Sequence, residues 1–184
     1  MIDENRHPED PVVGLLERMA ARSDRGGLAA LRASLREERK FDALRLVLPV
    51  LGPGTNTHRE DDAVLLAGLF GLHPVGASLS IASALRLVAI RSGSGSIEAR
   101  FRALLGSSRE ELPLHLRHAV SLVAGSNIGV DWTDLHRAIR YWDHDTDFVR
   151  RQWARDFWAG DTFDNALPTE SDQDLPVEDE PDED

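Results

Sequence analysis

Apolar residues recur every three or four positions along almost the entire chain, and no segment shows a convincing alternation of apolar and polar residues. Spacings of three and four place side chains on one face of an α-helix, whereas half-buried strands require alternation. The series Trp132, Leu135, Ile139 and Trp142 is one clear example. The pattern therefore predicts an all-α protein, a helical bundle of about nine helices.

Turn and capping residues predict where several helices begin and end. The glycine pair 26–27 is expected to precede a second helix, and the serine–glycine run 92–96 is expected to form a flexible loop. Thr57 and Glu60 have the spacing of a capping box, so a helix is expected to open there. Asp131 is expected to cap a later helix through its side-chain oxygen.

Further expectations concern individual helices. Pro49 is expected to kink or shorten the third helix. The buried face predicted for that helix consists of Phe41, Leu44, Leu48 and Leu51. Either Asp145 or Thr146 is expected to cap the last helix. All four tryptophans lie between residues 132 and 158, and their helical spacing places most of them in a packed C-terminal core.

The length of 184 residues fits one domain, or at most two small lobes. We expect an N-terminal arm over residues 1–11, a helical domain over 12–160 and an acidic tail over 161–184. Within the helical domain, a division into two packed lobes, 12–74 and 77–160, is plausible. Acids, prolines and other polar residues dominate the tail, which predicts that it is disordered.

The formal net charge of −11 lies entirely in the acidic tail, which carries eleven acidic residues and no basic residue. Residues 12–160 contain 20 basic and 17 acidic residues, so the helical domain is mildly basic. Of the 21 basic residues only Lys40 is a lysine, a bias that fits either a GC-rich genome or bidentate contact with phosphate. The tail either keeps the protein in solution or competes with nucleic acid for the basic face.

The chain contains no cysteine, which excludes disulfides, a thiol nucleophile and zinc sites with thiolate ligands. It has no P-loop, dinucleotide-binding glycine pattern, nucleophile elbow or zincin motif, so we expect neither an enzyme nor a cofactor. The acidic start has no apolar stretch, and the longest apolar-rich run, 63–72, is too short to span a membrane. We expect a soluble cytoplasmic protein with no membrane partner.

Two clusters raise the question of metal chemistry. His115 and His118 have the spacing of two ligands on one helix face, and residues 142–147 gather three aspartates and one histidine. The structural interpretation is that these are two ordinary helix histidines and a solvated turn. A metal-dependent hydrolase stays an alternative, which the metal content of the purified protein would separate from a non-enzymatic function.

Nine arginines form a candidate surface for contact with phosphate. Helical geometry places Arg32 and Arg36 near each other and turns Arg140 away from the apolar stripe of its helix. Arg151 is spaced to pair with Asp147. The alternative is a solvated face in which arginines form only salt bridges, as in a protein–protein adaptor. The nine candidates are Arg32, Arg36, Arg100, Arg102, Arg109, Arg117, Arg140, Arg150 and Arg151.

Several short motifs resemble one known family in their order and spacing. The segment 97–105 (IEARFRALL) is similar to its "RF-x-x-LL" helix, and 109–117 (REELPLHLR) is similar to its "reeLp-x-x-Lr" segment. The run 149–158 (VRRQWARDFW) resembles its closing "RRWARDF" motif. Further similar segments are Ala30–Arg32, Val130–Leu135 and Tyr141–Asp143.

The family that these motifs resemble is CasB, the small subunit of the type I-E CRISPR surveillance complex Cascade. The resemblance covers residues 26–158 and implies a non-enzymatic helical protein that forms a dimer and packs against the backbone and large subunits. It also implies contact with the crRNA–target assembly and with the displaced DNA strand of the R-loop. The contacts it suggests are Arg32, Arg100, Arg102, Arg117, Arg150 and Arg151. Ala33 stands where the family tends to have a second arginine.

Overall fold

The computed structural model describes residues 10–159, and their regular structure is helical. The only β-type pairing within this range is an isolated parallel bridge between Gly76 and Val130. The all-α prediction is therefore confirmed. The expectations for the acidic tail, and for most of the N-terminal arm, fall outside the described residues.

Nine α-helices follow one another along the described part of the chain. The first four are α1 (Pro11–Ala21), α2 (Arg25–Ala33), α3 (Lys40–Leu51) and α4 (Thr57–Leu72). The other five are α5 (Ile81–Ser92), α6 (Gly95–Leu105), α7 (Leu112–Gly125), α8 (Trp132–Arg140) and α9 (Phe148–Ala154). A short 3-10 turn (Glu37–Arg39) precedes α3, and a π-helical turn (Arg155–Ala159) extends α9.

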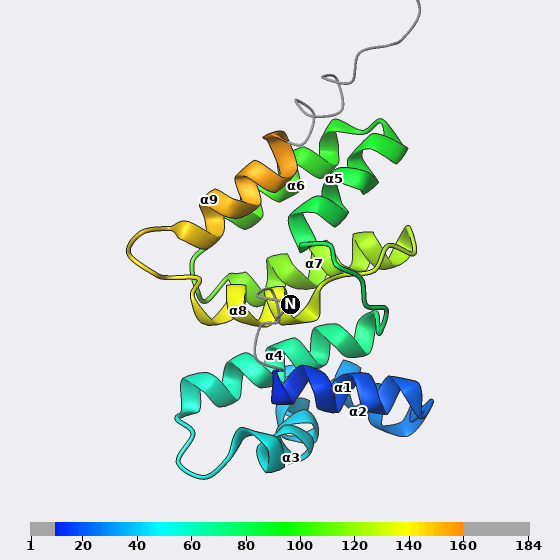
Figure 1. Cartoon of the computed structure of the whole chain (residues 1–184), viewed down its shortest axis with the longest axis vertical. Helices are drawn as coiled ribbons and strands as arrows, with labels where there is room; N and C mark the ends of the chain where they lie inside the picture. The colour runs from blue at the N-terminus through cyan, green and yellow to red at the C-terminus, as the bar shows by residue number, and fades with distance from the viewer. Residues whose placement is uncertain (1–9, 160–184) are drawn as a thin grey trace, which may run out of the picture.

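Figure 1 shows the helices stacked along the long axis of the molecule. At one end α1, α2 and α3 pack against one another and against α4, and at the other end α5, α6 and α7 pack together, with α9 against α5. Between them, α4 packs against both α7 and α8. A continuous set of helix contacts therefore links the two ends, and the division into lobes 12–74 and 77–160 stays a prediction.

The link between α4 and α5 is fixed to the segment that precedes α8. The ring of His73 forms a hydrogen bond with the carbonyl of Ile128 through Nε2 at 2.7 Å. The indole of Trp132 donates to the carbonyl of Val75 at 3.2 Å. Together with the isolated bridge, these bonds hold the start of α8 beside the end of α4.

The largest buried side chains are aromatic. Trp132, Trp142 and Trp153 are all at most 2 % exposed, whereas Trp158 is 40 % exposed. Phe101, from α6, stacks on the ring of Phe157 with the ring centroids 4.2 Å apart. The prediction that most tryptophans lie in a packed C-terminal core is confirmed.

The predicted caps of α4 and α8 give opposite outcomes. Asp131 caps α8 as expected, because its side chain accepts from the backbone N–H of Asp134 at 2.8 Å. The helix α4 opens at Thr57 as expected, but the capping box is wrong, because Thr57 is already helical and Asn56 is the cap. The Asn56 side chain accepts from the backbone N–H of Arg59 at 3.0 Å.

Two segments that were expected to separate helices are shorter than the sequence suggests. The glycine pair 26–27 lies inside α2, because Asp24 caps that helix and accepts from the Gly27 N–H at 2.9 Å. The expected loop 92–96 is likewise cut short, because Ser94 caps α6 and the helix begins at Gly95. Both corrections have one physical reason: a well-placed capping oxygen outweighs the low helix propensity of glycine.

The start of α9 also differs from the prediction. Neither Asp145 nor Thr146 is the cap; Asp147 occupies that position, with φ at 51° in the left-handed region. Its side chain makes no capping bond and instead accepts from Arg150 at 2.7 Å. Aspartate tolerates this backbone conformation better than most residues, so the helix starts later than either expected cap would place it.

The buried face of α3 is not the one predicted. Ala43 and Val47 are fully buried, whereas Phe41 is 65 % and Leu48 is 42 % exposed. The helix carries more large apolar residues than one face can bury, so the stripe alone does not determine the orientation. Pro49 lies inside α3, and the helix ends two residues later at Leu51. Pro49 therefore does not end α3 at its own position, and any shortening of the helix concerns only its last turn.

Candidate nucleic-acid interface

The nine candidate arginines separate into two groups by their contacts. Arg102, Arg109 and Arg150 form ion pairs with acidic side chains. The other six form no ion pair within residues 10–159, and all are exposed. An exposed guanidinium without an acidic partner keeps its donors available for a phosphate. The six are Arg32, Arg36, Arg100, Arg117, Arg140 and Arg151.

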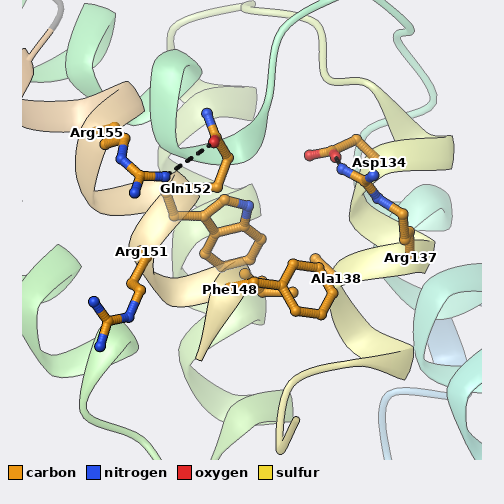
Figure 2. Close-up of a pocket in the computed structure, with 9 residues that line it drawn as sticks. Asp134, Arg137, Ala138, Phe148, Arg151, Gln152 and Arg155 are labelled. Carbon is orange, nitrogen blue, oxygen red and sulfur yellow. Dashed lines mark hydrogen bonds and ion pairs between the residues drawn. The ribbon is translucent and has the colours of Figure 1, made fainter. Parts of the chain in front are cut away.

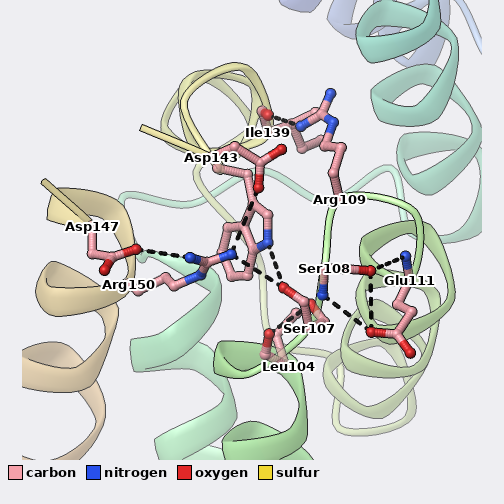
Figure 3. A network of polar contacts seen from close by, with 10 residues as sticks. Leu104, Ser107, Ser108, Arg109, Glu111, Ile139, Asp143, Asp147 and Arg150 are labelled. Atoms are coloured by element: carbon pink, nitrogen blue, oxygen red, sulfur yellow. Dashed lines mark hydrogen bonds and ion pairs between the residues drawn. The ribbon is translucent and has the colours of Figure 1, made fainter. Parts of the chain in front are cut away.

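Arg109 lies between α6 and α7 and reaches two other helices. Its guanidinium contacts the carboxylate of Asp62 on α4. It also donates to the carbonyl of Ile139 on α8, as Figure 3 shows. Burial lowers the pKa of Arg109, and Asp143 opposes this effect; because arginine normally titrates above about 12, it remains charged. The Asp62 side chain is only 7 % exposed. Arg109 therefore neutralises a buried charge and joins three elements.

Arg150 is the centre of a second internal network, also drawn in Figure 3. It donates to the carbonyl of Ser107 at 3.1 Å and to Asp147 at 2.7 Å. The indole of Trp142 donates to the same Ser107 carbonyl at 3.1 Å, and the Arg150 guanidinium lies 4.7 Å from the Trp142 ring centroid. Asp143 lies 3.7 Å from the guanidinium. Arg150 thus fixes α9 to the loop that follows α6.

The expected pair between Arg151 and Asp147 is wrong. Asp147 pairs with Arg150 instead, because Arg150 faces the loop after α6 and the next residue is turned about 100° around the helix. Arg151 is exposed and has no ion pair within the described range. Neighbouring arginines on one helix therefore have different environments.

Arg102 combines a surface ion pair with an aromatic contact. It donates to Glu98, one turn earlier on α6, at 2.6 Å. The same carboxylate accepts from the indole of Trp158 at 3.2 Å, and the Arg102 guanidinium lies 5.8 Å from that ring. These contacts lower the pKa of Glu98, with the Arg102 hydrogen bond as the main cause. Arg102 therefore helps to attach the last turn of the described chain to α6.

Arg32 is positioned by a close contact between α2 and α4. Its Nε donates to the carbonyl of Gly71 at 3.1 Å. A Cβ at Gly71 would lie 2.6 Å from the backbone nitrogen of Arg32, so the approach of the two helices requires glycine there. The Arg32 side chain is anchored at Nε, and its terminal nitrogens form no hydrogen bond within residues 10–159.

Arg151 lies on the rim of a cavity between α8 and α9 (Figure 2). The cavity measures about 310 Å³ and includes the exposed ring of Phe148 and the side chain of Arg155. On the α8 side Asp134 accepts from Arg137 at 2.8 Å. Burial raises the pKa of Asp134, and Arg137 opposes that rise. The α9 side of the cavity rim is therefore basic, whereas on the α8 side the charge of Arg137 is paired with that of Asp134.

The sequence matches the family described as CRISPR-associated protein Cse2 over residues 27–158, which is most of the chain. The chain belongs to the Cse2 family. This family, also named CasB, is the small subunit of type I-E Cascade, as the motifs in the second half of the sequence suggested. Membership implies a structural subunit that assembles with other Cascade subunits in CRISPR defence.

Three comparisons illustrate the match to Cse2 proteins. The CRISPR-associated protein Cse2 of Thermus thermophilus is 34 % identical over 141 residues, covering 71 % of this chain and 79 % of the relative. The crystal structure of CasB from Thermus thermophilus is 28 % identical and gives a TM-score of 0.69 over 80 % of this chain and 96 % of that chain. CasB from M. ruber, 23 % identical, shares the fold with a TM-score of 0.61 over 76 % and 87 % of the two chains.

Other arginines of this Cse2 protein were not among the nine candidates but have a similar environment. Arg155 contacts only Gln152, at 3.5 Å, and lines the cavity between α8 and α9. In the sequence Arg155 follows Arg151 by four residues on the last predicted helix, and this spacing could have identified it as a candidate. Four more arginines on α1–α3 are exposed and form no ion pair within residues 10–159: Arg18, Arg22, Arg25 and Arg45.

Neither cluster considered for metal chemistry forms an arrangement of metal ligands in the described part of the chain. Within residues 10–159 no three histidine, aspartate or glutamate side chains are arranged to hold a metal ion. His115 and His118 lie on α7, beside a small cavity, and His144 forms a hydrogen bond with Thr146. None of the helices in the described region combines the length and apolar character needed to cross a membrane.

Proposed function

We propose that this Cse2 protein is a non-catalytic Cascade subunit whose exposed arginines contact the phosphates of the crRNA–target assembly and stabilise the displaced DNA strand of the R-loop. One observation carries the proposal: six of the nine candidate arginines are exposed and have no ionic partner within the described residues. Because R-loop formation is nearly balanced energetically, contacts between a protein and the strand backbones can tip it.

Five of the six arginines lie on five different helices, and the sixth follows one of them. Arg32 lies at the end of α2 and Arg36 just beyond it, whereas Arg100 and Arg117 project from α6 and α7. Arg140 is the last residue of α8, and Arg151 lies on α9 at the cavity rim. Contacts of this kind bind phosphate without reading sequence, which suits a subunit whose target changes with every guide.

Arg109 and Arg150 receive a different role in this proposal. Their guanidiniums are occupied by carboxylates and backbone carbonyls, so they position the elements that carry the exposed arginines. Arg102 has an intermediate place, since its partner Glu98 is at the surface and an exposed ion pair exchanges easily for a phosphate.

Dimer formation and packing against the backbone and large subunits belong to the same proposal. Large apolar side chains that are exposed on α3, α5 and α7 are the candidate contacts for these partners. These side chains are Phe41, Leu48, Ile90 and Leu114.

The test is binding of the full chain to single-stranded DNA over a series of salt concentrations, measured by fluorescence anisotropy. Each phosphate contact contributes about −0.7 to the slope of log affinity against log salt, so four to six contacts predict a slope of about −3 to −4. The variant Arg100→Ala/Arg117→Ala/Arg151→Ala is expected to lose about two units of that slope. Arg150→Ala, whose guanidinium is occupied by Ser107 and Asp147, is the control: it removes one charge and is expected to leave the slope unchanged, against about 0.7 for each exposed arginine removed.

Absence of salt-dependent binding would contradict the proposal and favour a helical adaptor that contacts only proteins. A loss of slope per removed charge that is as large in the control would contradict it as well, since net charge rather than the exposed arginines would then determine binding.

A further inference from the structure

A second, smaller cavity lies between α5, α6 and α7 and measures about 130 Å³. Its interior is apolar, with Leu85 from α5, Phe101 and Leu104 from α6, and Leu122 from α7. Leu85, Phe101 and Leu104 belong to the buried core, so helix packing shapes the cavity walls. A preformed apolar cavity of this kind can accept a ligand without reorganising the fold.

The polar side chains that line this cavity are all basic: Arg100 from α6, and His115 and His118 from α7. The two histidines are three residues apart, so they share one face of α7. None of the three forms a hydrogen bond or an ion pair through its side chain within residues 10–159. Glu111 lies near His115 but accepts from Ser108.

The cavity between α8 and α9 provides a contrast, because Asp134 and Arg137 neutralise each other on its lining. No acidic side chain lines the smaller cavity. Its basic lining favours an anionic group, while its interior favours an apolar one. A suitable ligand therefore combines a negative charge with a small apolar ring or chain.

The size of the cavity restricts the ring. An engineered apolar cavity of about 150 Å³ in another protein binds benzene, so about 130 Å³ matches one six-membered ring. A purine has two fused rings and exceeds that space. We infer that this cavity binds one pyrimidine ring of a single strand, with Arg100, His115 and His118 contacting the adjacent phosphates.

This inference rests on the proposed function and adds a base-dependent contact to it. An apolar side chain from a protein partner would also fill the interior, but it would leave the Arg100 guanidinium without a counter-charge. A nucleotide supplies the ring and the charge together. Stacking of a base on an aromatic side chain typically strengthens binding by about fivefold to more than a hundredfold, and Phe101 supplies an aromatic ring in this lining.

The test compares three strands of equal length with the full chain: oligo-dT, oligo-dA and a strand in which every nucleotide is abasic. All three carry the same number of phosphates, so the proposed arginine contacts predict the same salt slope for each. The cavity predicts that oligo-dT binds at least about fivefold more tightly than the other two. Equal affinity for the three strands would overturn the inference and leave the cavity to a protein partner.

A variant that fills the cavity tests whether the preference for oligo-dT arises there. Ala103 is exposed and lines the cavity, so Ala103→Trp can fill it from the rim while all three basic residues remain. Ala99→Trp, one turn earlier on α6 and outside the cavity lining, is the matched control. The first variant is expected to bind oligo-dT as weakly as the abasic strand, and the control to keep the preference for oligo-dT.

The outcomes separate the two proposals. Salt-dependent binding without a preference for pyrimidines, or a preference that survives in Ala103→Trp, overturns the cavity assignment but leaves the arginine contacts intact. Failure of every strand to bind overturns both. Because the comparison of strands needs no variant, it remains decisive even if Ala103→Trp does not fold.

Discussion

Arg150 and Arg151 are adjacent on α9, yet they lie in opposite environments. Arg150 donates to Ser107 and Asp147 and lies over the ring of Trp142, whereas Arg151 points away to the rim of a cavity and pairs with no acid of the described chain (Figures 2 and 3). The same contrast separates Arg109 from Arg100. A basic surface is therefore defined by which guanidiniums lack partners, not by the number of arginines.

The largest expected effect comes from the most internal arginine. Arg109→Ala leaves the buried Asp62 carboxylate without its partner, which we expect to lower the free energy of unfolding by about 3 kcal/mol. Urea unfolding followed by circular dichroism measures the change. Adding Asp62→Asn to this variant removes the buried charge and should restore part of the lost free energy of unfolding. A loss below about 0.5 kcal/mol would mean that Arg109 behaves as an ordinary surface residue.

The second prediction compares the two neighbours on α9 directly. Arg150→Ala removes hydrogen bonds to Ser107 and Asp147 and the contact with Trp142, so we expect a loss of about 1.5 kcal/mol in the free energy of unfolding. Arg151→Ala, the matched control, should change it by less than about 0.5 kcal/mol. Equal losses in the free energy of unfolding for the two variants, measured by the same urea experiment, would contradict the distinction between internal and exposed arginines.

A third prediction extends the comparison to the ion pair that holds the start of α1. Asp10 accepts from His136 on α8 at 2.5 Å and caps α1 through Val12 and Val13. Burial acts to raise the pKa of Asp10, but the hydrogen bond and charge of His136, with the two backbone bonds, outweigh it and lower the pKa.

Because the pKa of Asp10 is lowered in the folded state, its contribution to stability is present above the unfolded value of about 3.9 and is lost as pH falls through the folded pKa. Asp10→Ala should therefore reduce the free energy of unfolding by about 1 kcal/mol at pH 7. The difference from the parent protein should shrink below about pH 4. Thermal unfolding across that pH range measures it, and a difference that grows in acid would contradict the assigned sign.

The smallest expected effect concerns the acidic tail. If residues 161–184 compete with nucleic acid for the exposed arginines, a chain that ends at Gly160 should bind single-stranded DNA about fivefold more tightly at low salt and about equally at high salt. Anisotropy titrations of the two chains make the comparison. An unchanged affinity at low salt would favour a tail that only keeps the protein in solution.

The sequence predicted the fold class well because helical spacing and caps such as Asp131 act over a few residues. It failed on α3, where Phe41 and Leu48 offered an alternative apolar face and packing buried Ala43 and Val47 instead. Local pattern cannot distinguish two faces that are both apolar. The family resemblance supplied the expected partners and function.

The candidate site was less predictable for a different reason. Arg109 and Asp62 are 47 residues apart, so no local spacing indicates that they meet. Arg150 lies 43 residues from the Ser107 carbonyl that it contacts. The sequence gives the positions of the arginines, but only the packing of α4, α8 and α9 determines which ones are occupied internally.

The most direct test of the central claim is the salt dependence of single-stranded DNA binding for Arg150→Ala and Arg151→Ala, measured under conditions where both variants are folded. We expect the slope of log affinity against log salt to become about 0.7 less steep for Arg151→Ala and to stay unchanged for Arg150→Ala. The same change in both variants, or a change only in Arg150→Ala, would contradict it.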